Sequence, residues 1–134
     1  RDVAPSRGLG DVYKRQVESS GIYQSVARST YLHQGFVRIT NNGNGYVGMA
    51  GGTECNVICG TVKLNVYLER SSGDGNFYSY MKWENVDYNE ASLYMSKQVK
   101  VEKGYYYRLR GYHSCTKNGV TENGGSRTDG IYIG

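Results

Sequence analysis

Proline, histidine and cysteine are all scarce in this chain. Its 134 residues include one proline, two histidines and three cysteines. No apolar run approaches the roughly 18 residues that a membrane-spanning helix needs. Nor does any segment show heptads or a long amphipathic helix. We therefore expect no membrane insertion and no helical bundle, with turns built on the 19 glycines and on asparagine.

A strong excess of positive charge is also missing. The formal charge is +4, but residues 1–16 have a composition unlike the rest and resemble translated adapter sequence. We expect them to be a non-native or disordered lead-in, followed by a single domain over residues 17–134. The lead-in holds four basic and two acidic residues, which leaves +2 on the domain. So small a charge gives no support to nucleic-acid binding.

The 14 tyrosines and the short alternating segments predict an all-β protein. The clearest alternation is Val62, Leu64, Val66 and Leu68, which predicts an antiparallel strand with one face on a core. Further strands are expected near residues 22–26, 36–40, 46–51, 77–83, 91–101, 105–114 and 130–133, with a loop at 85–89. About seven short strands separated by turns are typical of an immunoglobulin-like antiparallel β-sandwich.

The segment Gly104-Tyr105-x-Tyr107-x-Leu109-x-Gly111 resembles the sixth strand of a fibronectin type III domain. That resemblance implies that Tyr105 is a corner tyrosine, whose hydroxyl bonds to backbone upstream. We expect Leu64, Val66, Tyr105, Tyr107 and Leu109 in the core, and Trp83 as a core residue or a plug at the sheet edge.

A second resemblance covers residues 45–133. Residues 63–70, a Gly-Asp-Gly turn, Trp83, residues 104–108 and residues 111–114 together resemble small secreted proteins of unknown function from gut Firmicutes, chiefly Clostridia. This resemblance implies an extracellular or cell-surface location on a Gram-positive bacterium. It supplies no catalytic or ligand-binding residues.

The three cysteines are Cys55, Cys59 and Cys115. No second pair of ligands stands at zinc-site spacing, so we expect no metal site. In an exported protein one disulfide and one leftover thiol are expected. Antiparallel strands would bring Cys55 or Cys59 beside Cys115. A local bridge between Cys55 and Cys59 is the rival, and three unpaired thiols are the third alternative.

Two motifs suggest chemistry but are better explained by structure. Residues 43–48 match G-x-G-x-x-G, yet no helix start follows, so a hairpin turn is the better interpretation. His113 shares a strand face with Tyr107 and Leu109, which favours a structural, hydrogen-bonded histidine over a catalytic base. We expect neither an enzyme nor a cofactor.

The outward face of the tyrosine-rich strand is the strongest candidate for binding. Tyr106, Arg108, Arg110 and Tyr112 share one parity, and Tyr67 lies on the solvent face of a neighbouring strand. Tyrosine rings and guanidinium groups can stack on sugars or hold an acidic partner. They can equally just cover the sheet. The first hypothesis is therefore a non-catalytic module that binds a glycan or surface protein, and the second is a structural protein that self-associates through sheet edges.

Overall fold

A computed structural model describes residues 16–24 and 30–134. Within these ranges the chain forms seven strands and no helix. The strands are β1 (Glu18–Gln24), β2 (Leu32–Gly43), β3 (Tyr46–Ser71), β4 (Tyr78–Lys100), β5 (Tyr105–Lys117), β6 (Val120–Arg127) and β7 (Ile131–Ile133). The described part of the chain has no helix that could cross a bilayer. The lead-in expected over residues 1–16 lies outside the described residues except for Gln16.

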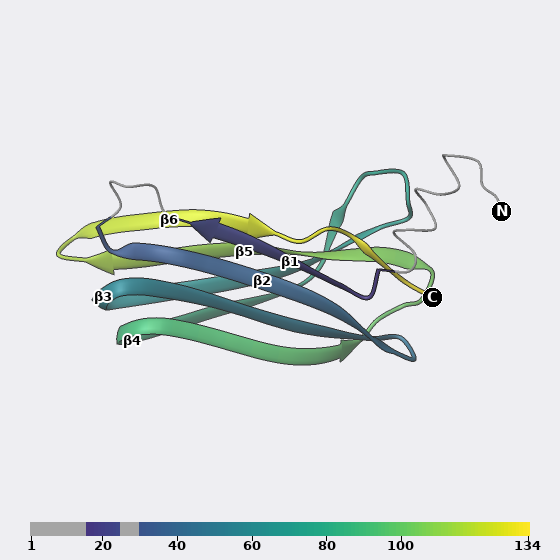
Figure 1. Ribbon diagram of the computed structural model, residues 1–134, viewed down its shortest axis with the longest axis horizontal. Coiled ribbons are helices and arrows are strands. Elements are labelled where there is room, and N and C mark those ends of the chain that lie inside the picture. Colours follow the sequence, from purple (N-terminus) through teal and green to yellow (C-terminus); the bar gives the residue numbers. More distant parts are fainter. Residues whose placement is uncertain (1–15, 25–29) are drawn as a thin grey trace.

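All strand pairings are antiparallel, and the strands belong to one sheet in the order β1-β2-β3-β5-β6. The last strand, β7, pairs with the start of β5. The expectation of an all-β fold is confirmed. A sandwich of the immunoglobulin or fibronectin type III kind is not confirmed, because the sheet is continuous and curls until it is nearly closed into a barrel (Figure 1).

The long strand β3 produces this curl. Its first half pairs with β2, and its second half pairs with β5. Its register with β4 shifts between Glu54 and Cys59, where the chain bends. We expected separate strands here, and a loop at 85–89. Instead β4 continues through that segment and bends with its partner, with Asn89 at a positive φ of 55°.

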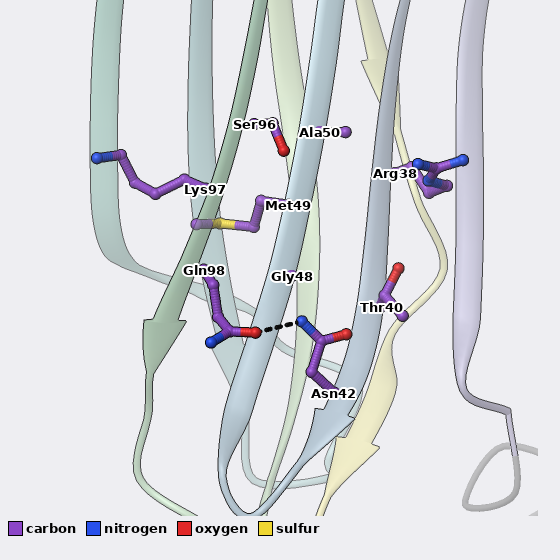
Figure 2. Close-up of a pocket in the computed structure, with 9 residues that line it drawn as sticks. All are labelled: Arg38, Thr40, Asn42, Gly48, Met49, Ala50, Ser96, Lys97 and Gln98. Carbon is purple, nitrogen blue, oxygen red and sulfur yellow. Dashed lines mark hydrogen bonds between the residues drawn. The ribbon is translucent and has the colours of Figure 1, made fainter.

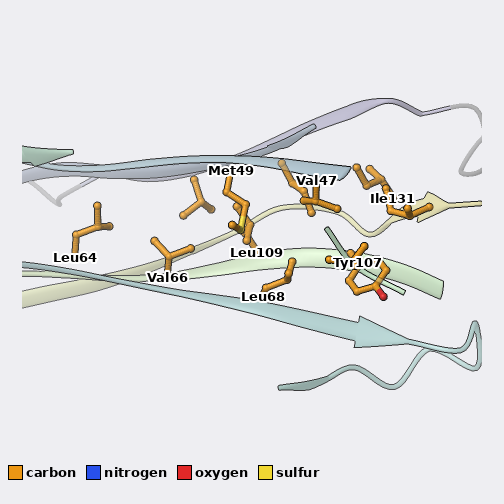
Figure 3. Close-up of a cluster of buried hydrophobic side chains, with 12 residues drawn as sticks. Val47, Met49, Leu64, Val66, Leu68, Tyr107, Leu109 and Ile131 are labelled. Carbon is orange, nitrogen blue, oxygen red and sulfur yellow. The ribbon is translucent and has the colours of Figure 1, made fainter. Parts of the chain in front are cut away.

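The core lies between the two halves of β3. Figure 3 shows Val47 and Met49 of the first half facing Leu64, Val66 and Leu68 of the second. The expected core residues Leu64, Val66, Tyr107 and Leu109 are fully buried, whereas Tyr105 is only half-buried. Trp83 is half-buried against the rim of the core, as expected for a plug at the sheet edge.

The corner hydrogen bond comes from a different tyrosine than expected. The Tyr107 hydroxyl donates to the carbonyl of Glu102 at 2.6 Å. Tyr105 instead stacks on the guanidinium of Arg70, 4.1 Å from its ring centre. Tyr105 and Tyr107 lie two residues apart and share one strand face, but only the Tyr107 ring is fully buried. The assignment of the corner role to Tyr105 is therefore wrong, and the role belongs to the next tyrosine on the same face.

Side chains join the two ends of the sheet. The Glu122 carboxylate of β6 accepts hydrogen bonds from the backbone N–H groups of residues 30, 31 and 32, at 3.0, 2.8 and 2.7 Å. The N–H of Asp129 donates to Ser19 Oγ of β1 at 2.8 Å. No backbone ladder between β1 and β6 is found in the described residues.

Candidate functional site

The structure brings the predicted binding residues onto one outer face. In the β3–β5 register Tyr67 lies opposite Arg110, Glu69 opposite Arg108, and Asn65 opposite Tyr112. The alternate residues of β5, including Tyr107, Leu109 and His113, are buried in the interior. These side chains therefore lie on the face that their parity predicts, and pairing with β3 makes them neighbours.

Glu69 lies between the two arginines and is almost buried. Its carboxylate accepts hydrogen bonds from Arg108 Nε at 2.8 Å and from Arg110 Nε at 3.1 Å. Burial raises the pKa of Glu69, but the two guanidinium groups outweigh it and hold the pKa below its usual value. The carboxylate is therefore ionised at neutral pH and fixes both arginine side chains against the sheet.

Aromatic rings hold the same guanidinium groups from the other side. Arg108 lies 4.1 Å from the ring centre of Phe77, and Arg110 lies 4.2 Å from that of Tyr67. Tyr106 packs on Tyr132, with ring centres 5.1 Å apart. Part of the predicted face thus covers the sheet: Tyr106 and Arg108 serve mainly in packing.

Arg110 remains available to a ligand because its side chain is 47% exposed. It lies directly opposite Arg127 of β6. Like charges in directly opposed cross-strand positions destabilise a sheet. No ion pair or hydrogen bond of the Arg127 side chain is found within the described residues, and this face holds three guanidinium groups against one carboxylate.

A depression of about 460 Å³ opens between these two arginines. We call it the two-arginine depression. It is lined by Ile22, Arg110, Gly111, Tyr112, Gly125, Ser126 and Arg127. Gly125 lies opposite Tyr112 in the ladder, so the ring stands beside a residue without a side chain. Arg127 could not be placed from the sequence, which predicts no strand over residues 120–127. A strand beginning near Ile22 is predicted, but without β6 nothing places Ile22 beside Arg127.

A polar trough of about 430 Å³ lies on another part of the sheet, where β2, the first half of β3 and the end of β4 pair. Figure 2 shows Arg38, Thr40 and Asn42 on one wall and Ser96 and Gln98 on the other, with Gly48 and Ala50 between them. Asn42 Nδ2 donates to Gln98 Oε1 at 2.7 Å, bridging the trough above Gly48. This bridge occupies two of the amides that a ligand would need.

His113 is fully buried and both of its ring nitrogens are engaged. Nδ1 lies 3.0 Å from Thr53 Oγ1, and Nε2 lies 2.7 Å from Ser126 Oγ. The Thr53 hydroxyl donates its one proton to the carbonyl of Lys63, so it accepts from Nδ1–H, and Nε2 accepts from Ser126. Gly35 lies directly on the ring, and a side chain there would overlap it.

Burial lowers the pKa of His113 to about 4, while the backbone of Gly52 acts in the opposite direction. The imidazole is therefore neutral at pH 7, and both hydroxyl partners hold it in place. Its bond with Ser126 is a buried contact in which the hydroxyl is the donor. This supports the expectation of a structural histidine.

The three cysteines converge at one end of the barrel. Their sulfur atoms all lie within 4.8 Å of one another, and all three are free thiols. The expected proximity of Cys115 to Cys55 and Cys59 is confirmed, while the expected disulfide is not formed. Cys59 faces inward with the parity of Val47, Met49 and Thr53 in the first half of β3, and the alternation reverses between Cys59 and Val62.

Comparison with known proteins places the chain in a family without assigned chemistry. A family of unknown function, DUF6147, matches residues 8–130, which is most of the chain, and the chain belongs to this family. The matched range begins inside the lead-in. No curated protein and no solved structure matches.

Proposed function

We propose that this member of the DUF6147 family is a non-catalytic, secreted or surface-associated module that binds an anionic glycan in the two-arginine depression. The observation that carries the proposal is the cross-strand pair Arg110–Arg127, two like charges placed opposite each other beside the half-buried ring of Tyr112. A carboxylate or sulfate between the two guanidinium groups would remove their repulsion.

The chemistry of the lining favours a charged sugar. Guanidinium groups bind carboxylates and sulfates through paired, charge-assisted hydrogen bonds. The ring of Tyr112 and the side chain of Ile22 supply apolar surface for the face of a sugar ring. Because Glu69 and Tyr67 already fix Arg110, little side-chain entropy is lost when a ligand binds.

The site is shallow and shows no arrangement for catalysis. Both nitrogens of His113 are engaged, so it is not free to act as a base. In the described part of the chain the depression holds no carboxylate pair, and Glu69 is bonded to two arginines. These contacts support binding without turnover.

The test is binding of the intact domain to arrays of uronate-bearing, sulfated and neutral glycans. We expect binding to the anionic set only, weakening as salt rises. Arg127→Gln should lower affinity roughly tenfold or more, since a charge-assisted hydrogen bond contributes about 1.5–3 kcal/mol. Tyr112→Ala should lower it as well.

The matched control is Arg38→Gln, which removes an exposed arginine from the polar trough. It should leave binding unchanged. Loss of binding in Arg38→Gln but not in Arg127→Gln would move the site to the trough. Blank arrays together with capture of a surface protein would replace the glycan by a protein ligand.

A second candidate function is self-association through β4. This strand spans 23 residues, and within the described chain it pairs only with β3, so its other edge is free. Its exposed side chains include the apolar or aromatic residues Tyr78, Val86, Tyr88 and Tyr94. Long free edges with apolar side chains are templates for pairing with another chain.

The charges on β4 suit pairing with a second copy. If two copies pair antiparallel about Trp83, Lys82 of each lies opposite Glu84 of the other, and this contact occurs twice by symmetry. The same register sets Tyr78 opposite Tyr88. Within one copy the Lys82 and Glu84 side chains lie 4.0 Å apart and are exposed.

A charge swap tests this candidate. Lys82→Glu and Glu84→Lys should each abolish the dimer in light scattering, because like charges then face each other across the interface. The double variant should restore it. If the wild-type protein stays monomeric at high concentration, or if both single variants still dimerise, pairing through β4 is excluded.

A further inference from the structure

The cysteine cluster is the most concentrated set of metal-binding atoms in the described chain. The sulfur atoms of Cys55, Cys59 and Cys115 all lie within 4.8 Å of one another. Cys59 and Cys115 are fully buried, and Cys55 is partly exposed. The cluster thus has a closed interior and one side open to entry.

Two separate features of the fold create the cluster. Cys55 and Cys59 flank the bend of β3, where the register with β4 shifts and brings the two thiols together. Cys115 reaches them from β5, because it lies opposite Val62 in the β3–β5 ladder. Leu32 and Val62 pack around the sulfurs and shield them from water.

Apolar surroundings disfavour the charged form of the Cys55 and Cys115 thiols in the absence of a cation. Burial raises the pKa of Cys55 to about 11, and the neighbouring Cys59 adds to the rise. Burial raises the pKa of Cys115 further. Cysteine side chains facing one another gain little from hydrogen bonding, since S–H is a weak donor and sulfur a weak acceptor.

We propose that Cys55, Cys59 and Cys115 form a three-coordinate site for a single soft cation, Cu(I). Metal–thiolate bonds of about 2.3 Å place the sulfurs of a planar three-coordinate centre about 4 Å apart. The observed limit of 4.8 Å requires only small side-chain movements. Soft thiolate ligands select Cu(I) and zinc among biological metals.

The number of ligands favours copper over zinc. Structural zinc sites are almost always tetrahedral with four protein ligands. Within residues 16–24 and 30–134, no histidine, carboxylate or further cysteine joins these three as a fourth ligand. Three sulfur ligands satisfy Cu(I) without a fourth donor.

Binding is a proton exchange, and no electrons are transferred. Three S–H groups release three protons to solvent as three sulfur–copper bonds form, and copper enters and stays as Cu(I). The site then carries a net charge of −2. Lys117 Nζ donates a hydrogen bond to the carbonyl of Ile58 at 3.1 Å. Because Ile58 lies between Cys55 and Cys59 in the chain, this ammonium group is close to the cluster. That ammonium group offsets part of the charge.

The test is anaerobic titration of the reduced full chain with Cu(I) in competition with a chromogenic Cu(I) chelator. We expect one copper per chain, sulfur-to-copper absorption in the ultraviolet, and a raised thermal midpoint. All three cysteines should become protected from alkylation together. Protection of two thiols, or binding no tighter than to the unfolded chain, would overturn the site.

Variants locate the copper. Cys55→Ser, Cys59→Ser and Cys115→Ser should each reduce affinity at least a hundredfold. Met95→Leu is the matched control, since it removes a sulfur that packs on the main core and should leave binding unchanged. Because buried substitutions can unfold the domain, the alkylation test on wild-type protein stands as an independent check.

Two outcomes would replace the proposal. If the protein binds zinc tightly but fails to take Cu(I) from the chelator, the cluster is assigned to zinc with water as the fourth ligand. A stable disulfide between Cys115 and either Cys55 or Cys59 in the native protein, found by non-reducing peptide mapping, would assign the cluster to oxidation.

Discussion

Protonation of His113 should make this domain sensitive to mild acid. The imidazole is buried neutral between Thr53 and Ser126. Its pKa is about 4 in the folded protein, against an ordinary value of 6.5 in the unfolded chain. Because the folded pKa is lowered, the unfolded state binds more protons between these values, so stability falls as pH drops below 6.5.

The magnitude follows from the difference in pKa. Each pKa unit corresponds to about 1.36 kcal/mol, so moving from pH 8 to pH 5 should cost about 2 kcal/mol. The whole effect, completed near pH 4, is about 3 kcal/mol. Glu54, Glu69 and Glu122 also have lowered pKa values. Their contributions are present above their ordinary value of 4.5 and are lost as pH falls below it, so they add little above pH 5.

Urea denaturation at half-unit steps from pH 8 to pH 5 measures the effect. His113→Asn keeps a polar side chain but removes the titrating group, so it should be less stable at pH 8 and show a flatter pH profile. Taking the difference between the two proteins removes every other titrating group. Parallel profiles for wild type and His113→Asn would refute the buried neutral histidine.

Three further predictions concern stability. Leu64→Ala should cost about 2–5 kcal/mol in urea denaturation, since Leu64 is fully buried in the core; a smaller loss would mean that the core refills the space. Tyr107→Phe should cost about 1 kcal/mol through the hydrogen bond to Glu102, whereas Tyr105→Phe should be near neutral; the reverse order would restore the corner role to Tyr105. A chain beginning at Val17 should keep its thermal midpoint, and a loss of several degrees in a melting scan would show that the lead-in contributes to the fold.

The all-β class and the central strand could be predicted because Val62–Leu68 alternates strictly and buries one face. The continuity of β3 and β4 could not, because residues 54–61 and 85–90 are polar or lack alternation, and it is their pairing with neighbouring strands that makes them strands. The segment 120–127 has a similar polar pattern, with two glycines and an asparagine. It becomes a strand because it pairs with β5 and because Glu122 bonds to the backbone of residues 30–32.

The candidate sites divide in the same way. Parity along one strand placed Arg108, Arg110 and Tyr112 correctly on a common face. Arg127 was missed together with its strand, so the opposed pair of arginines could not be foreseen. Antiparallel pairing predicted that Cys55 or Cys59 lies near Cys115. The convergence of all three sulfurs depends on a bend in β3, and periodicity carries no signal for a bend.

The contacts that join β1 and β2 to β6 have a consequence for how the domain opens. They link residues about 90 to 110 positions apart in the chain, and they run through the Glu122 and Ser19 side chains. Hairpins such as β3–β4 and β5–β6 join residues much closer in sequence, so they can form while the first strand is still unattached. The sheet is therefore a nearly closed ring of strands whose two ends are joined mainly by a few side-chain hydrogen bonds. Local opening should begin at this junction, because a few side-chain hydrogen bonds break before a backbone ladder does. Protonation of Glu122, as pH falls below 4.5, should weaken the junction further.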